Sequence, residues 1–198
     1  MTDKSESQRE GTDEALMVRY QRGDRNALTV MMRRYARQIY ATAFGIVGNP
    51  EIAAELTQNS FLALVGQAGS FHIEMQFRPW LLGFLHQLLM DRCVDTSAAG
   101  TGTITNSGRV AVEESDAFAA SKSTRSQLLS RRIAECKAGL SLLDREALVM
   151  KLTAQLTLAE LAVATASNGE VVRSRLRSAL DRLRESVSDT EEFARALR

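Results

Sequence analysis

Apolar side chains recur at steps of three and four residues along most of this chain, a spacing that places them on one face of an α-helix. One such stripe is formed by Leu28, Met31, Met32, Tyr35, Ile39, Ala43 and Ile46. Alternating patterns typical of strands are hard to find, and only two prolines interrupt the 198 residues. The sequence therefore predicts an all-α fold.

A change in composition divides the chain. Helical stripes run through 13–95 and return over 127–187, whereas 96–126 is dominated by Thr, Ser, Gly and Ala. We therefore expect two small helical domains over 13–95 and 127–187, joined by a flexible linker over 96–126. A polar, disordered arm at 1–12 and a short charged tail at 188–198 complete the expected organisation.

Short polar residues stand before several of the apolar stripes, where they can accept a hydrogen bond from the first turn of a helix. Asp24 and Asn49 hold such positions in the first region. Ser141, Thr157 and Asn168 hold equivalent positions in the second. We expect a helix to begin immediately after each of these residues.

The helix that we expect to start at Pro79 and extend to about Val94 is unusually apolar. Its apolar side chains, such as Trp80, Phe84 and Leu88, spread round most of its circumference. Two interpretations fit this pattern. Either the helix lies at the centre of its domain and is buried on several sides, or part of its apolar surface faces a protein partner.

Composition excludes several classes of protein. Lys and Arg number 25 and Asp and Glu 24, a formal net charge of +1, which excludes a strongly basic nucleic-acid coat and an acidic disordered chain. No apolar run reaches the roughly 18 residues of a membrane helix, so no membrane insertion is expected.

The polar start argues against a secretory signal. Two cysteines exclude a disulfide framework, so the expected compartment is the cytoplasm.

Motifs that carry catalytic or metal chemistry are missing from the sequence. The candidate zinc ligands Cys93, Cys136, His72 and His86 do not have the spacing of a metal site. A glycine-rich phosphate loop, a nucleophile elbow and the chain order of a catalytic triad are also absent. We therefore expect a protein that is not an enzyme and that needs no cofactor or metal.

Positive charge is concentrated in the last expected helix. The segment 173–184 holds five arginines against Asp181, a net charge of +4. A shorter helix precedes it, and the tight turn Ala166-Ser167-Asn168 joins the two, which is the pattern of a helix-turn-helix. Arginines at the start of such a helix can reach phosphates and guanine edges. The alternative is an ordinary solvated amphipathic helix, and spacing alone does not decide between the two.

Taken together, the elements over 13–95 and 127–187 resemble the extracytoplasmic-function (ECF) sigma factors of the sigma-70 family. The segment Glu55-Leu56-Thr57-Gln58-Asn59-Ser60-Phe61-Leu62 is similar to the one with which these factors bind the clamp helices of the RNA polymerase β′ subunit. Phe77-Arg78-Pro79-Trp80-Leu81, followed by Asp91-Arg92, is similar to the segment that binds the promoter −10 element. Val172-Arg173-Ser174-Arg175-Leu176 is similar to the helix that reads the −35 element.

The resemblance implies a sigma factor that binds core RNA polymerase at the β′ clamp helices and the β flap, and that directs promoter-specific initiation. The residues implied in polymerase binding are Glu55, Gln58, Asn59, Phe61 and Leu62. Phe61 also lies on an apolar stripe, so a position in the core is the alternative for this residue. Those implied at the −10 element are Arg78, Trp80, His86, Gln87, Asp91 and Arg92. Those implied at the −35 element are Asn168, Arg173, Ser174, Arg175 and Arg177. Promoter DNA is the second implied partner, and an anti-sigma factor is a further candidate.

Two departures from the family pattern bear on function. Several basic residues usually follow the tryptophan, but here those places hold Gly83, His86, Gln87, Val94 and Asp95, so fewer phosphate contacts are expected. The turn of the helix-turn-helix usually reads Leu-Gly-Ile, whereas here it is Thr165-Ala166-Ser167. Losing the glycine is expected to strain this turn, and losing two apolar side chains to weaken the small core beneath it.

Two other functions fit the same residues. The first is a sigma mimic or regulator that occupies polymerase with degenerate −10 recognition, which the depleted basic set favours. The second is a stand-alone helix-turn-helix repressor, which would bind duplex DNA without polymerase, usually as a dimer on paired half-sites.

Overall fold

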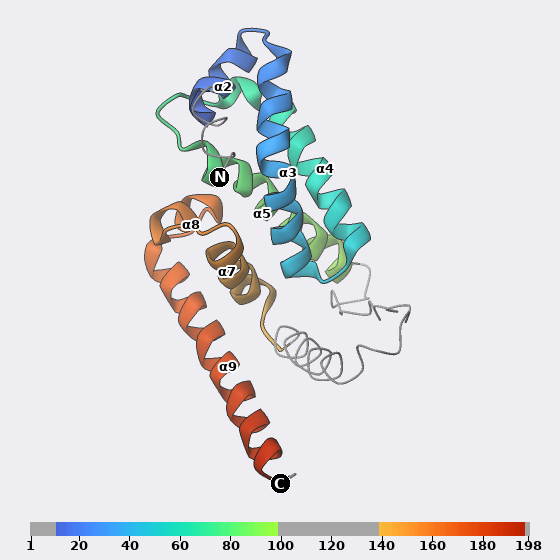
Figure 1. Ribbon diagram of the computed structural model, residues 1–198, viewed down its shortest axis with the longest axis vertical. Helices are drawn as coiled ribbons and strands as arrows, with labels where there is room; N and C mark the ends of the chain where they lie inside the picture. The colour runs from blue at the N-terminus through green and yellow to red at the C-terminus, as the bar shows by residue number, and fades with distance from the viewer. Residues whose placement is uncertain (1–10, 99–138, 197–198) are drawn as a thin grey trace, which may run out of the picture.

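The computed structural model describes residues 11–98 and 139–196, and the regular elements in these ranges are helices (Figure 1). The all-α prediction is confirmed for this part of the chain. Most of the arm expected at 1–12, the linker from position 99 onward, and the expected start of the second domain at 127–138 lie outside the described residues.

Eight elements make up the described chain. The N-terminal half contains α2 (Asp13–Gln21), α3 (Arg25–Val47), α4 (Pro50–Gly66), the short 3₁₀ helix η1 (Ala68–Ser70) and α5 (Phe77–Ala98). The C-terminal half contains α7 (Leu142–Thr153), α8 (Leu158–Ala164) and α9 (Gly169–Ala196). Figure 1 shows α9 extending as a long rod away from the rest of the molecule.

The predicted N-caps are confirmed, because each side chain accepts a hydrogen bond from the first turn of its helix. Asp24 accepts from the backbone N–H of Asn26, and Asn49 from those of Glu51 and Ile52. Thr157 forms a reciprocal capping box with Glu160 at the start of α8. Ser141 and Asn168 likewise accept from the backbone N–H groups of residues 144 and 171.

Three helix limits differ from the prediction. Helix α5 was expected to end at about Val94, but it continues to Ala98, three residues into the expected linker. Helix α5 begins at Phe77 rather than at Pro79, because the Glu14 carboxylate accepts a hydrogen bond from the Phe77 N–H and so caps the extra residues. At the other end of the chain, α9 continues to Ala196, so the segment that we expected to be a tail is helical as far as that residue.

Helix α5 lies at the centre of the fold and contacts α2, α3, α4 and α8. Its buried apolar side chains are Phe77, Leu81, Leu82, Phe84, Leu85 and Leu89. The first of the two interpretations of this apolar helix is therefore confirmed. The cover comes partly from the N-terminal half and partly from α8, which belongs to the same chain.

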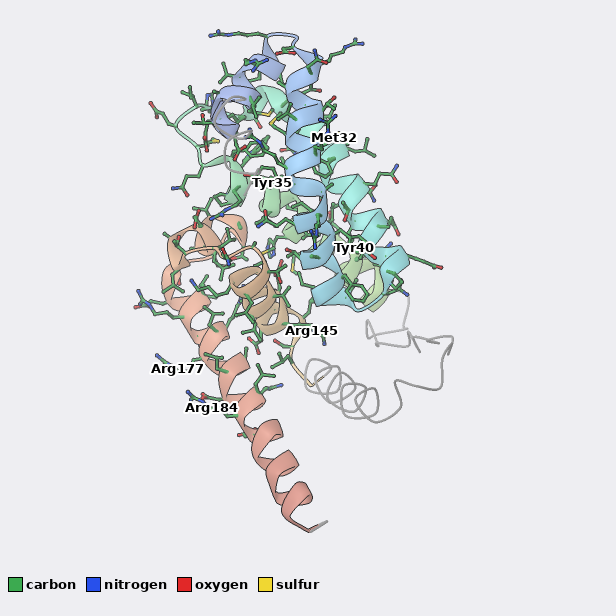
Figure 2. The ribbon with its side chains drawn as sticks, in the orientation of Figure 1. Met32, Tyr35, Tyr40, Arg145, Arg177 and Arg184 are labelled. Atoms are coloured by element: carbon green, nitrogen blue, oxygen red, sulfur yellow. The ribbon has the colours of Figure 1, made fainter. Side chains whose placement is uncertain are left out.

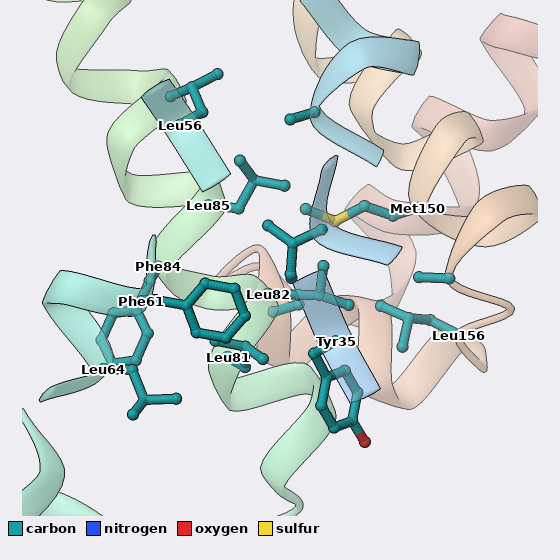
Figure 3. Packing of buried hydrophobic residues seen from close by; sticks show 14 of the residues in the cluster. Tyr35, Leu56, Phe61, Leu64, Leu81, Leu82, Phe84, Leu85, Met150 and Leu156 are labelled. Atoms are coloured by element: carbon teal, nitrogen blue, oxygen red, sulfur yellow. The ribbon is translucent and has the colours of Figure 1, made fainter. Parts of the chain in front are cut away.

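The two helical halves share one buried core. Val149 and Met150 of α7 and Leu161 of α8 belong to the same cluster of buried side chains as Ile39 and Leu85 (Figure 3). Packing between the halves runs mainly through α3 against α7 and α5 against α8. In the described residues, none of the helices is long and apolar enough to cross a membrane.

Candidate nucleic-acid interface

A tight turn joins α8 to α9. Ala166 adopts a left-handed conformation with φ of +45°, and the Ser167 N–H donates to the Ala162 carbonyl oxygen over 2.9 Å. Asn168 then caps α9 by accepting from the Val171 N–H over 2.8 Å. The predicted helix-turn-helix geometry is therefore present, and a residue other than glycine occupies the left-handed position, as the departure from the family pattern predicted.

The first turns of α9 present polar side chains to solvent. The exposed side chains are those of Asn168, Arg173, Ser174 and Arg177. Val172, on the opposite side of the helix, is buried against the core. Figure 2 shows Arg177 and Arg184 along this helix. Four of the five residues implied at the −35 element therefore share one accessible surface, which we call the α9 face (Asn168, Arg173, Ser174, Arg177).

Arg175, the fifth of these residues, has a different position. Its side chain is half-buried, and its Nη1 lies 3.4 Å from the Ser167 hydroxyl in the turn. This contact crosses from the second turn of α9 back to the segment that precedes it. Arg175 is therefore placed to hold the turn rather than to extend outward with its neighbours.

Four of the residues implied in polymerase binding lie on one side of α4. They follow the helical spacing i, i+3, i+4, i+7, and none of them is buried. These residues are Glu55, Gln58, Asn59 and Leu62. We call this surface the α4 face. Phe61 is different, because only 5% of its surface is exposed and it belongs to the central core. This burial agrees with the alternative that Phe61 is a core residue that holds α4 in place, and its contact with polymerase stays a prediction.

The residues implied at the −10 element do not form one surface. On α5, Gln87 and Asp91 are exposed, and Arg92 pairs with Glu55 of α4 over 2.5 Å. Arg78 and His86 instead lie on the side of α5 that meets the C-terminal half. The predicted set is therefore divided between a surface open to solvent and the boundary between the two halves.

Trp80 belongs to an aromatic cluster at the start of α5. The centre of its ring system lies 5.0 Å from the ring of Phe71 and 4.7 Å from that of Phe84, with the latter ring nearly perpendicular. Such tilted and edge-to-face pairs stabilise a fixed ring position. Trp80 is half-buried, so part of it remains accessible beside the exposed loop that precedes α5.

Arg78 and His86 contact carboxylates of the C-terminal half. Arg78 Nη2 lies 3.0 Å from Glu160 Oε1 of α8. His86 Nδ1 lies 2.9 and 3.0 Å from the two carboxylate oxygens of Glu146 in α7. The pKa of Glu160 is lowered, chiefly because its carboxylate accepts the backbone N–H of Thr157, and Arg78 adds to this effect.

Three consecutive charged residues of α7, Asp144, Arg145 and Glu146, are buried. Arg145-Glu146 belongs to the segment that resembles the −35-reading region of the family, but the sequence did not predict that these side chains would be buried against the N-terminal half. Arg145 donates to the carbonyl oxygens of Ile46 at 3.0 Å and Leu140 at 3.2 Å, and burial lowers its pKa. Charged side chains are rarely buried without partners. The available signal for this burial was the position of these charged residues among apolar residues of α7. A charged side chain in such a position indicates a hydrogen-bonding partner on another element.

Helix α2 positions the start of α5, which sequence reasoning also did not find. The Glu14 carboxylate accepts the Phe77 N–H over 3.2 Å, and the Gln21 amide donates to the carbonyl oxygens of Ala68 and Phe71 over 2.8 Å. Asp13 accepts from the Tyr35 hydroxyl, and the pKa of Tyr35 is raised, first by burial and then by this contact. Helix α2 thus fixes both the loop before α5 and its first residue.

Within the ranges that the structure describes, no three His, Cys, Asp or Glu side chains come together as a metal site. Cys93 is half-buried, and burial raises the pKa of its thiol, the opposite of what an activated thiolate needs.

Comparisons with known proteins point to one family. A family described as Sigma-70 region 2 matches residues 31–98. The ECF RNA polymerase sigma factor SigK of Mycobacterium ulcerans (strain Agy99) is 28% identical over 173 residues, which cover 86% of this chain and 90% of that protein.

Two solved structures share the fold. CnrH in complex with the cytosolic domain of CnrY matches with a TM-score of 0.67 and 16% identity, over 89% of this chain and 97% of that one. The sigma factor RpoE, in complex with the anti-sigma factor NepR from Bartonella quintana, matches with a TM-score of 0.60 and 15% identity. That match covers 81% of this chain and 96% of the other.

Proposed function

The chain belongs to the sigma-70 family as an ECF sigma factor, which directs RNA polymerase to promoters, and we propose that it reads two promoter elements with separate surfaces. This membership decides against the stand-alone repressor and the sigma mimic. Proteins of this family act by binding and not by catalysis. The observation that carries the proposal is the α9 face, a capped, basic and exposed helix start that follows a tight turn.

The α9 face suits the −35 element. Arg173 and Arg177 can each donate two hydrogen bonds to the edge of a guanine or bind phosphate, and Ser174 can donate to either. Val172 and Ala179 are buried on the other side of the helix, so they fix which side chains turn outward. Arg175 supports the face through the Ser167 contact and is proposed to act indirectly.

The α4 face suits the β′ clamp helices of core polymerase. Leu62 is 59% exposed on this face, and Gln58 and Asn59 offer hydrogen-bonding groups beside it. An exposed apolar side chain within a polar surface is typical of a protein interface. In the C-terminal half Leu152 and Val163 are also strongly exposed, which supports contact with the β flap.

The −10 element is assigned to α5 and to the loop before it. Gln87, Asp91 and part of Trp80 are accessible there, and an aromatic ring can stack with an unpaired base. Separating and extruding such a base costs a few kcal/mol, which pocket contacts must offset. Arg78 and His86 belong to the proposed surface, but they contact the C-terminal half in this structure.

An anti-sigma factor is a further proposed partner, since the two similar solved structures are complexes, one with the cytosolic domain of CnrY and one with the anti-sigma factor NepR. The apolar side chains of α5 between 80 and 94 offered one docking surface for such a partner. Most of them are buried inside this chain, so an anti-sigma factor would have to bind elsewhere or displace α8.

Run-off transcription tests the proposal. Purified chain is added to core polymerase on a library of upstream regions from its own genome. Initiation from a defined set of start sites, which share two sequence elements, is the expected result. Binding to core polymerase without initiation would contradict promoter recognition, and failure to bind core polymerase would contradict the assignment of the α4 face.

A further inference from the structure

We propose that two copies of this chain pair through the outward sides of α3 and α4, and that the resulting dimer covers the surface assigned to core polymerase. The pairing belongs to the free chain and does not depend on the proposed function. Its consequence does rest on that function, because it takes the α4 face as the surface that meets polymerase.

The outward side of α3 carries two arginines followed by two aromatic rings. These side chains are exposed and follow the helical spacing i, i+4, i+7, i+11, and we call this surface the α3 face (Arg33, Arg37, Tyr40, Phe44). Within the described residues, neither arginine has an ion-pair partner. Tyr40 and Phe44 are 37% and 40% exposed, and their rings lie nearly parallel with centres 6.2 Å apart. The α3 face therefore offers unpaired positive charge beside an exposed apolar surface.

The α4 face carries complementary groups at the same spacing. Glu51 is exposed one turn before Glu55, so α4 presents two carboxylates, then the Gln58 amide, then the Leu62 side chain. A single offset of 18 residues matches the positions of the α3 face with these positions on α4. The matched pairs are Arg33 with Glu51, Arg37 with Glu55, Tyr40 with Gln58, and Phe44 with Leu62. Each arginine thus meets a carboxylate, and the apolar ends of the two faces meet each other.

Two-fold symmetry allows these pairs to form at the same time. Helices α3 and α4 pack side by side and run in opposite directions, since only Gly48 and Asn49 connect them (Figure 1). A two-fold axis perpendicular to the plane of these helices therefore lays α3 of one copy along α4 of the other, with the two running parallel. Parallel helices keep a constant offset in sequence, and a two-fold interface repeats every contact in both directions. Each matched pair therefore forms twice.

The strength of the pairing comes from apolar cover more than from charge. Exposed ion pairs contribute little free energy each, so the arginines mainly fix the register, while the rings of Tyr40 and Phe44 supply apolar contact. Glu55 already accepts from Arg92 of α5 at 2.5 Å, but a carboxylate has enough acceptor sites for a second arginine. Fewer residues take part than the about 20–30 per side of a standard interface, so we expect a weak, reversible dimer.

A second copy and polymerase compete for one surface. The dimer covers Glu55, Gln58 and Leu62 of the α4 face, which are also proposed to meet the β′ clamp helices. A paired chain therefore has to separate before it binds polymerase. Chain in excess of core polymerase is stored as the dimer and is released as monomers are consumed.

Charge exchange tests the pairing in the free, full-length chain. Arg33→Glu with Arg37→Glu makes both faces acidic, and Glu51→Arg with Glu55→Arg makes both faces basic. We expect the parent to show a reversible monomer–dimer equilibrium in sedimentation experiments over about 1 μM to about 1 mM, which spans the affinities of weak interfaces. Each variant alone should self-associate at least about tenfold more weakly, because like charges then face each other.

An equimolar mixture of the two variants should restore the dimer, because the acidic faces of one chain then meet the basic faces of the other. A chain with all four exchanges should pair with itself again, which separates loss of pairing from loss of fold. Arg22→Glu with Arg25→Glu makes the same change in net charge as the acidic variant, at exposed positions beside the turn from α2 to α3. This control should self-associate like the parent.

Three results would overturn the dimer. They are a parent that stays monomeric throughout this range, an equal loss of pairing in the control, and a mixture of the two variants that stays monomeric. A monomeric parent would leave the α3 face to a different partner with an acidic surface.

Competition with polymerase is measured separately. Core polymerase is added in equal amount to the parent at a concentration at which the free chain is dimeric. We expect a complex with one chain per polymerase and loss of the dimer, whereas a complex with two chains per polymerase would overturn the competition. Failure of the proposed function gives a different result, because no complex would then form and the dimer would remain.

Discussion

Gly45 of α3 and Val149 of α7 approach so closely that a Cβ at position 45 would lie 2.7 Å from the Val149 Cγ1. Glycine inside a helix costs stability relative to alanine because it loses more backbone freedom on folding. The close approach offers a physical reason for glycine at this position. The two halves of the molecule meet here with almost no intervening side chain.

Gly45→Ala should therefore destabilise the chain. Overpacking in a well-filled core costs about 1–3 kcal/mol, and the better helix propensity of alanine offsets at most about 1 kcal/mol of it. Gly66→Ala is the matched control, since a Cβ there meets nothing within 4 Å. Urea unfolding curves of the two variants provide the measurement. If Gly45→Ala is as stable as Gly66→Ala, the close approach of α3 and α7 is not present in solution.

Ala166→Gly should stabilise the C-terminal half. Ala166 holds φ of +45° in the turn before α9, a conformation that costs a residue with a Cβ about 1–2 kcal/mol and glycine much less. Ala162→Gly in α8 should have the opposite sign, because glycine is unfavourable within a helix. Thermal melts followed by circular dichroism compare the two. A lower melting temperature for Ala166→Gly would argue against the left-handed turn.

Phe61→Asp and Leu62→Asp should fail in different ways, although the residues are neighbours. Phe61 is buried in the core, where loss of the ring alone costs about 3–5 kcal/mol, so its replacement should unfold the N-terminal half. Leu62 is 59% exposed, so Leu62→Asp should keep the fold and lose binding to core polymerase. Circular dichroism and co-elution with core polymerase separate the two effects. A folded Leu62→Asp variant that still co-elutes would remove Leu62 from the polymerase interface.

Arg173→Ala and Arg177→Ala should weaken use of the −35 element. Loss of a base contact costs about 1–3 kcal/mol and relaxes specificity at that base pair. Arg184→Ala changes the net charge equally on the same helix but lies about three turns beyond Arg173. Initiation from a mapped promoter and from the same promoter with a scrambled −35 element provides the readout. Equal losses in all three variants would indicate a general charge effect.

Glu160 should make stability depend on pH in the acid range. Its pKa is lowered in the folded chain, mainly by the hydrogen bond from the Thr157 N–H. A carboxyl group with a lowered pKa contributes stability above its ordinary value of 4.5, and this contribution disappears as pH falls through the folded pKa. The urea midpoint of the parent should therefore fall more steeply below about pH 4.5 than that of Glu160→Gln. Parallel curves for the two proteins would contradict this role.

Local chemistry explains which features the sequence could predict. Asp24, Asn49 and Thr157 cap their helices by contacts within three residues, so the signal lies entirely in the adjacent sequence. The exposed side of α9 was predictable for the same reason, since its helical period separates the arginines from Val172. For Phe61 the sequence left two positions open, because a family motif gives a place in the chain, whereas burial decides which side of α4 the residue occupies.

Contacts between residues that are far apart in the sequence account for the features that the sequence did not predict. The start of α5 at Phe77 depends on Glu14, and the packing of α7 depends on Gly45, and neither pair is close in the sequence. Gly45 was not singled out, because the local sequence does not say which element approaches a glycine within a helix. Likewise, the partners of the buried charges of α7, the Ile46 carbonyl oxygen and His86, lie too far away in the sequence to be predicted from it.

The hydrogen bonds from α2 to the start of α5 determine where the molecule can be divided. A fragment that begins at Arg25 would contain every residue of α3, α4 and α5, and it would nevertheless lose the Glu14 acceptor for the Phe77 N–H and the Gln21 donor to the loop. It would also expose the surface that Leu16 and Met17 cover. The smallest N-terminal fragment able to fold by itself therefore starts no later than Thr12, the N-cap of α2, and shorter fragments would report on a disordered −10 surface.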